Sequence, residues 1–130
     1  NICTNETLIA LMGAMHMSLL GPEGLEALAV RNLAASTLAK EKLREIDGIK
    51  IPHADSHHFN EFVIELPGST DECLSYLDGV GVVGGFNLSA WYPERTNWLL
   101  VTCTDQTTVK EIHTLTTELE NWVHTLEVSA

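Results

Sequence analysis

The chain has 130 residues, 45% of them hydrophobic, which is long and apolar enough to fold as one domain without a metal or a disulfide. Eighteen acidic residues outnumber seven basic ones, so the net charge is -11. Such a surface repels phosphate backbones and anionic lipid headgroups, so we expect no nucleic-acid partner and no membrane partner. The cysteines Cys3, Cys73 and Cys103 lie too far apart for a zinc or disulfide framework, which favours reduced thiols in a cytoplasmic protein.

The N-terminal third is predicted to be helical. Between residues 5 and 20, apolar side chains recur at steps of three and four, which indicates a helix with a core or interface face. Thr4 or Asn5 is suited to cap its start. Gly21-Pro22 separates this helix from a second one over 22–46. The inward side of the second helix is expected to carry Leu25, Leu28, Ala29, Leu33 and Leu43.

The remaining elements mix strands and helices. Alternation over 59–66 predicts a strand, and the nearly continuous apolar run 98–103 predicts a central strand. Between them a capping-box pattern, with serine at Ser69 and glutamate three residues later, begins a helix that ends near residue 78. The run 79–85 suits a short strand that leads into a flexible glycine turn, and 86–95 an irregular loop.

A last helix begins after Thr104 and Asp105, which offer caps. Its apolar stripe consists of Val109, Ile112, Leu115, Leu119, Trp122 and Val123. This order of elements predicts an α+β fold with two layers, in which helices cover one face of a small, mainly antiparallel sheet.

The residues alone predict no catalytic site. His53, His57 and His58 form a histidine cluster, but its loop setting specifies no ligand geometry, so no metal site is assigned. The run 79–84 matches G-x-G-x-x-G without the preceding strand and following helix that dinucleotide binding requires. Four lysines, Lys40, Lys42, Lys50 and Lys110, all lie in polar surroundings that do not suit a Schiff base.

Several segments nevertheless resemble one family. They are Asn1-Ile2-Cys3-Thr4-Asn5, the run Leu19-Leu20-Gly21-Pro22-Glu23-Gly24-Leu25, Phe59-Asn60-Glu61-Phe62-Val63, Gly84-Gly85 and Trp91-Tyr92-Pro93-Glu94. In this order they resemble the glycine cleavage system P-protein, and most of all the C-terminal part of subunit 1 in its two-subunit form. The resemblance covers nearly the whole chain. It implies that residues 1–130 are one C-terminal small domain like that of fold-type I pyridoxal-phosphate enzymes.

The resemblance also implies a function. The family decarboxylates glycine and passes the aminomethyl group to the lipoyl arm of H-protein. Pyridoxal phosphate would be bound to a lysine of subunit 2, with none expected in this fragment alone. The implied partners are subunit 2, the H-protein lipoyl arm and the large domain of the same subunit, against which helix 5–20 would pack. Thr4 and Asn5 would lie near the cofactor phosphate as cofactor-binding residues, although a helix cap alone also accounts for Thr4.

One alternative comes from another class. Small α+β domains of similar element order bind amino acids and regulate enzymes, and such a module would bind its ligand alone. The exposed aromatic loop is a further expectation: Phe86, Trp91 and Tyr92 should lie on a surface that the parent enzyme covers. Packing of these rings on the domain's own sheet is the competing interpretation.

Overall fold

The computed structural model describes residues 6–128. Its helices are α1 (Glu6–Arg44), α2 (Thr70–Gly79) and α3 (Val109–Val128), with a short 3-10 helix η1 (Leu88–Ala90). Its strands are β1 (Glu61–Glu65), β2 (Phe86–Asn87) and β3 (Trp98–Thr102). The strands form one antiparallel sheet in the order β1-β3-β2. The run 98–103 therefore does supply the central strand, as its continuous apolar character predicted.

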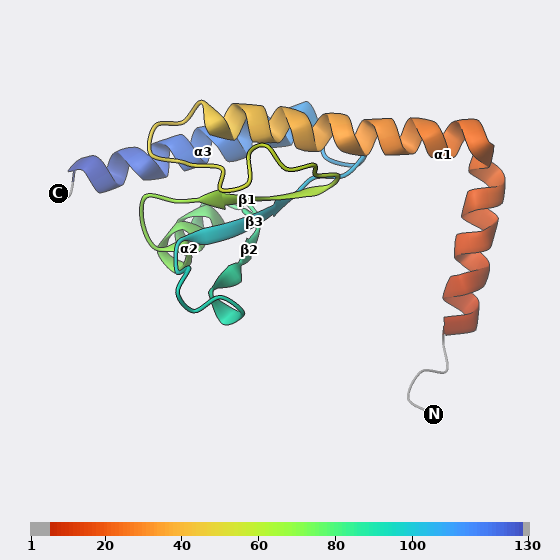
Figure 1. The fold of residues 1–130 in the computed structure, drawn as a ribbon, viewed down its shortest axis with the longest axis horizontal. Helices are drawn as coiled ribbons and strands as arrows, with labels where there is room; N and C mark the ends of the chain where they lie inside the picture. The colour runs from red at the N-terminus through yellow and green to blue at the C-terminus, as the bar shows by residue number, and fades with distance from the viewer. Residues whose placement is uncertain (1–5, 129–130) are drawn as a thin grey trace.

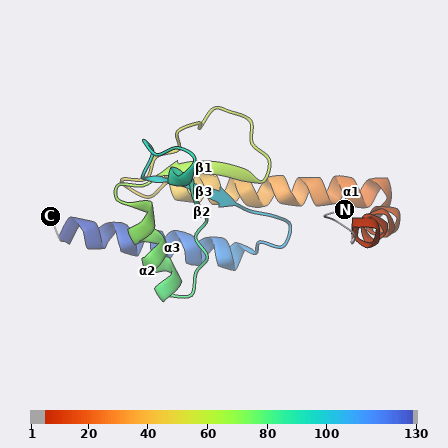
Figure 2. The ribbon, with the colours of Figure 1, turned by 90° about the horizontal axis from the view of Figure 1, so that it is seen from below.

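The helices cover one face of this sheet. Alternate residues Phe62 and Ile64 of β1, and Leu99 and Val101 of β3, are buried, because side chains point to opposite faces along a strand. Figures 1 and 2 show the second half of α1 and α3 running side by side along the sheet. The side chains that join this core from the helices include Ala39, Leu43, Cys73, Leu77, Ile112, Leu119 and Trp122. The predicted two-layer α+β fold is thus confirmed.

Helix α1 bends at Gly21, where the backbone has a φ of 63° that favours glycine, and Pro22 begins the second segment. The two predicted helices are therefore present, but the second ends at Arg44 rather than at residue 46. Figure 1 shows the segment before the bend projecting away from the sheet. Its exposed side chains include Leu8, Leu11, Met12, Met15 and Leu19.

By length and composition, α1 could cross a membrane. The bend, however, divides it into two segments, and within the described residues the one before Gly21 covers residues 6–20. Fifteen residues of helix reach only about 22 Å. That is shorter than the ~30 Å hydrocarbon core of a bilayer.

Several local predictions were wrong. Leu25, Ala29 and Leu33 are exposed, because only the part of α1 from Asn32 onward lies over the sheet. The buried residues of α1 are Asn32, Ser36, Ala39 and Leu43. The run 79–85 contains no strand, and β2 instead begins at Phe86, inside the predicted loop.

The predicted helix caps also differ. Ser69 holds the N-cap position of α2, but its side chain makes no capping hydrogen bond. Helix α3 is capped by Thr108 rather than by Thr104 or Asp105. The Glu111 carboxylate accepts from the Thr108 N–H at 2.7 Å, and the Glu111 N–H donates to the Thr108 hydroxyl at 3.2 Å. That reciprocal pair is a capping box.

Candidate functional site

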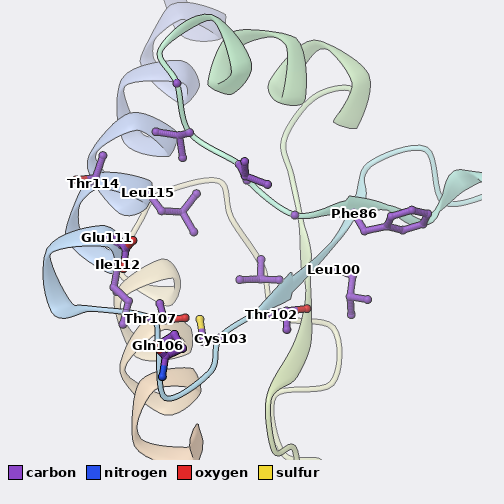
Figure 3. Close-up of a pocket in the computed structure, with 16 residues that line it drawn as sticks. Phe86, Leu100, Thr102, Cys103, Gln106, Thr107, Glu111, Ile112, Thr114 and Leu115 are labelled. Carbon is purple, nitrogen blue, oxygen red and sulfur yellow. The ribbon is translucent and has the colours of Figure 1, made fainter. Parts of the chain in front are cut away.

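The best-defined hollow of the described residues is a cleft at the β2 side of β3, with a volume of about 700 Å³. Segment 81–86 forms one wall, and the first turns of α3 form the other. Figure 3 shows Ile112 and Leu115 of α3 on the wall opposite this segment, whereas Phe86 and Leu100 point away from α3. This volume is typical of small-molecule sites, which usually range over about 300–1,000 Å³.

Two glycines open this cleft. Gly85 has a φ of 146°, and a Cβ there would lie 2.3 Å from the Leu100 carbonyl oxygen. A Cβ on Gly84 would lie 2.3 Å from Leu77 Cδ1. Gly85 is therefore required by its backbone conformation and by its contact with β3, whereas a side chain at Gly84 would have to displace Leu77. Gly84, the last glycine of the G-x-G-x-x-G match, thus has a packing role in place of a dinucleotide-binding role.

The cleft offers little chemistry of its own. Burial raises the pKa of the Cys103 thiol, so this cysteine stays protonated and is a poor nucleophile. Hydrogen bonds from Thr108 lower the pKa of the Glu111 carboxyl, and capping already engages that carboxylate. None of the residues that line the cleft is basic.

His53, His57 and His58 all line one small hollow beside Lys40. His53 packs edge-on against Trp98 with ring centroids 5.9 Å apart, and His58 against Phe62 at 6.0 Å. Desolvation, and then the charge of Lys40, lower the pKa of His58. Within residues 6–128, no group of three or more His, Cys, Asp or Glu side chains is placed to hold a metal ion.

The aromatic loop lies on the surface, as expected. Phe86 and Trp91 stack with centroids 4.9 Å apart, and Trp91 is 68% exposed. Tyr92 is also exposed, and Arg95 lies 4.7 Å above the ring of Trp98. The rings therefore do not form the core of this domain.

Thr4 and Asn5, the predicted cofactor-binding residues, lie outside the described residues, so the structure leaves that prediction untested. The four lysines all lie within them. Lys40 donates to the Ala54 carbonyl at 2.9 Å, Lys42 pairs with Glu45, Lys50 pairs with Glu65, and Lys110 is exposed. None lies in the desolvated surroundings that a Schiff-base lysine needs.

Sequence reasoning missed a buried polar junction. The Asn32 Oδ1 atom accepts from the Asn60 side-chain amide at 3.1 Å and from the Asp105 N–H at 3.2 Å. Ser36, which is fully buried, donates to the Phe59 carbonyl. These bonds tie α1 to the start of β1 and to the loop before α3. Polar residues at steps of four within an apolar helix are the signal that could have revealed the junction.

Comparison with solved structures shows which proteins share this fold. The fold matches an archaeal O-phosphoseryl-tRNA(Sec) selenium transferase with a TM-score of 0.62 over 78% of this chain and 26% of that one, at 15% identity. A closer match is the inhibitor-bound glycine decarboxylase (P-protein) of the glycine cleavage system. The TM-score is 0.80 at 30% identity, over 93% of this chain and 27% of that one. The chain therefore has the fold of about one quarter of each of these two larger proteins.

The family follows from sequence comparison. The model of the glycine cleavage system P-protein matches residues 1–119, and this chain belongs to that family. Relatives named "Probable glycine dehydrogenase (decarboxylating) subunit 1" share 38% identity over 112 residues in Nitratidesulfovibrio vulgaris (strain DP4) and 41% over 120 residues in Geotalea uraniireducens (strain Rf4). These alignments cover 86% and 92% of this chain, but only 25% and 27% of the relatives. The chain thus spans about a quarter of their length, and the family resemblance seen in the sequence is confirmed.

Proposed function

We propose that this chain is the C-terminal small domain of subunit 1 of a two-subunit glycine dehydrogenase (decarboxylating). The complete enzyme decarboxylates glycine and transfers the aminomethyl group to the lipoyl arm of H-protein. The observation that carries this proposal is the agreement of fold and family: a TM-score of 0.80 to a glycine decarboxylase together with subunit 1 relatives at 38–41% identity.

The chain's own part in that activity is structural. Residues 6–128 do not fit a pyridoxal-phosphate site by themselves, because no lysine among them is desolvated. We therefore assign the lysine-bound cofactor to subunit 2 and expect none in the isolated chain. When bound there, the cofactor supplies an electron sink for the carbanion left by decarboxylation.

The segment of α1 before the bend is the proposed contact with the large domain of the same subunit. Its long apolar side chains, including Met15 at 57% and Leu19 at 85% exposure, have nothing to cover them within the described residues. A helix that is apolar on most of its circumference is normally enclosed. Thr4 and Asn5, just before this segment, would then lie near the cofactor phosphate, since a helix N-terminus suits an anion.

The exposed rings Phe86, Trp91 and Tyr92 are a second proposed contact within the assembled enzyme. Subunit 2 and the lipoyl arm of H-protein complete the set of proposed partners. We also place the enzyme in the cytoplasm, because reduced thiols and an acidic surface suit that compartment.

The alternative is that the chain is an amino-acid-binding regulatory module, and the observation that favours it is the presence of the cleft. Its lining, however, has no cationic group for a ligand carboxylate, and its one acid, Glu111, already caps α3. Melting of the chain with glycine and with other amino acids tests this alternative, which requires a rise in melting temperature.

The experiment for the main proposal measures exchange of labelled carbon dioxide with the carboxyl group of glycine. We expect exchange by the complete subunit pair and none by the 130-residue chain alone. Exchange above the blank by the chain alone would contradict the division of labour between the subunits.

A further inference from the structure

The β2-side edge of the central strand is bare where it borders the cleft. Strand β2 pairs with β3 at two positions only, Phe86 with Leu100 and Asn87 with Leu99. The Cys103 N–H donates toward β1, to the Asn60 carbonyl at 2.9 Å. Because successive residues of a strand direct their peptide groups to opposite sides, the N–H and C=O of Thr102 are directed away from β1, toward the cleft.

The glycine turn causes this opening. In a longer β2, residue 84 would continue the ladder opposite Thr102, by the register of the two existing pairs. The chain instead leaves β3 at Gly85, where φ is 146°. Among residues 6–128, no backbone hydrogen bond is recorded to the Thr102 N–H.

We propose that the cleft holds an extended segment from the part of the same subunit that lies outside these 130 residues, added as a strand to the bare edge of β3 at Thr102. The proposal rests on the proposed function, because it requires that the chain be one domain of a longer subunit. About three quarters of the length of the subunit 1 relatives lies outside the aligned region, so such a segment has an ample source.

The walls of the cleft define the chemistry of this segment. A residue paired opposite Thr102 shares its face of the sheet, so the residues on either side of it point toward α3. There they meet Ile112 and Leu115, with Val82 on the other wall. The segment therefore carries apolar side chains on both sides of the paired residue. Main-chain hydrogen bonds to Thr102 would supply the affinity of this segment, and the apolar wall would fix its register.

A small ligand and a second copy of this chain are the competing occupants. The lining has no basic group to hold a carboxylate or phosphate. A second copy would have to offer one of its own edge strands: β2 is only two residues long, and the outer side of β1 already pairs with Lys50 at Glu65. An extended stretch of the remaining subunit meets neither difficulty.

The test is residue-resolved amide hydrogen exchange on the complete subunit, bound to its partner subunit, without glycine. The Leu100 N–H, which is paired with β2, is the internal reference. We expect the Thr102 N–H to exchange within about tenfold of Leu100. Exchange of Thr102 as fast as in an unstructured peptide, with Leu100 protected, would overturn the proposal. Protection that appears only with an added amino acid, or only at high protein concentration, would overturn it too.

A matched pair of variants gives a second measurement. Thr102→Pro removes the backbone N–H, and this loss is tolerated at an unpaired edge but not in a paired strand. Thr102→Val keeps the N–H. We expect only the proline variant to lower the melting temperature of the complete subunit. Equal melting of both variants would contradict the added strand. Neither measurement uses catalysis, so a protected Thr102 in a subunit pair inactive toward glycine would refute the proposed function alone.

Discussion

Replacing Asn32 with alanine tests the polar junction that holds α1 on the sheet. The change removes the acceptor of two hydrogen bonds, from the Asn60 amide at 3.1 Å and from the Asp105 N–H at 3.2 Å. A buried donor left without a partner costs about 1–3 kcal/mol. Asn60 and Asp105 are only half-buried, so water can partly solvate the two donors after Asn32 is removed. The lower end of this range of about 1–3 kcal/mol therefore applies to each donor.

The expected loss is therefore about 2 kcal/mol in the free energy of unfolding, or roughly 6–10 °C in melting temperature for a domain of this size. Urea unfolding of the variant and the parent measures it. Asn121→Ala is the control, since Asn121 is exposed and its only recorded bond, to Glu118, is 3.4 Å long. A change below about 0.5 kcal/mol for Asn32→Ala would refute the reasoning, because surface substitutions alone give that much.

Four further outcomes are expected. Gly85→Ala should cost at least about 2 kcal/mol in urea unfolding, because a Cβ would meet the Leu100 carbonyl oxygen at 2.3 Å, and an unaffected variant would contradict the close approach. Thr108→Ala should cost about 0.5–2 kcal/mol at neutral pH. Folding lowers the pKa of Glu111, so the ionised carboxylate stabilises the fold above its unfolded pKa, and this contribution is lost as pH falls through the folded pKa. The destabilisation caused by Thr108→Ala should therefore be smaller in acid than at neutral pH. An equal destabilisation in acid and at neutral pH would count against the capping box. Met15→Asp should leave the urea unfolding of the isolated chain nearly unchanged but weaken its association with the rest of subunit 1, and equal association would remove α1 from that contact. Thr4→Ala in the complete subunit pair should weaken pyridoxal-phosphate affinity, whereas unchanged affinity with a lower melting temperature would leave Thr4 as a cap only.

The parts of the fold predicted from sequence are those governed by local periodicity. The alternation of apolar and polar residues predicted the buried face of β1, on which Phe62 and Ile64 lie two residues apart. The apolar run at 98–103 indicated a strand paired on both sides, and β3 is central. In α3, Ile112 and Leu119 are buried as their spacing predicted, although Val109 at the helix start is exposed.

The features that were missed depend on contacts between distant segments. The partners of Asn32 lie 28 and 73 residues away in the sequence, so the four-residue step to Ser36 could mark a polar site on α1 but could not identify what it binds. The glycines at 84 and 85 were expected to form a flexible turn, but their close approach to Leu77 and Leu100 could not be predicted from the local sequence. The cleft follows from the course of this turn, so the sequence alone did not reveal it.

We propose that this domain is a required part of a glycine-decarboxylating enzyme. The most direct measurement compares glycine-dependent carbon dioxide exchange by the complete subunit pair with exchange by a pair whose subunit 1 lacks residues 22–128. We expect exchange by the complete pair and none by the truncated pair, with subunit 2 still binding the cofactor in both. Full exchange by the truncated pair, or no exchange with glycine by the complete pair loaded with cofactor and H-protein, would contradict it.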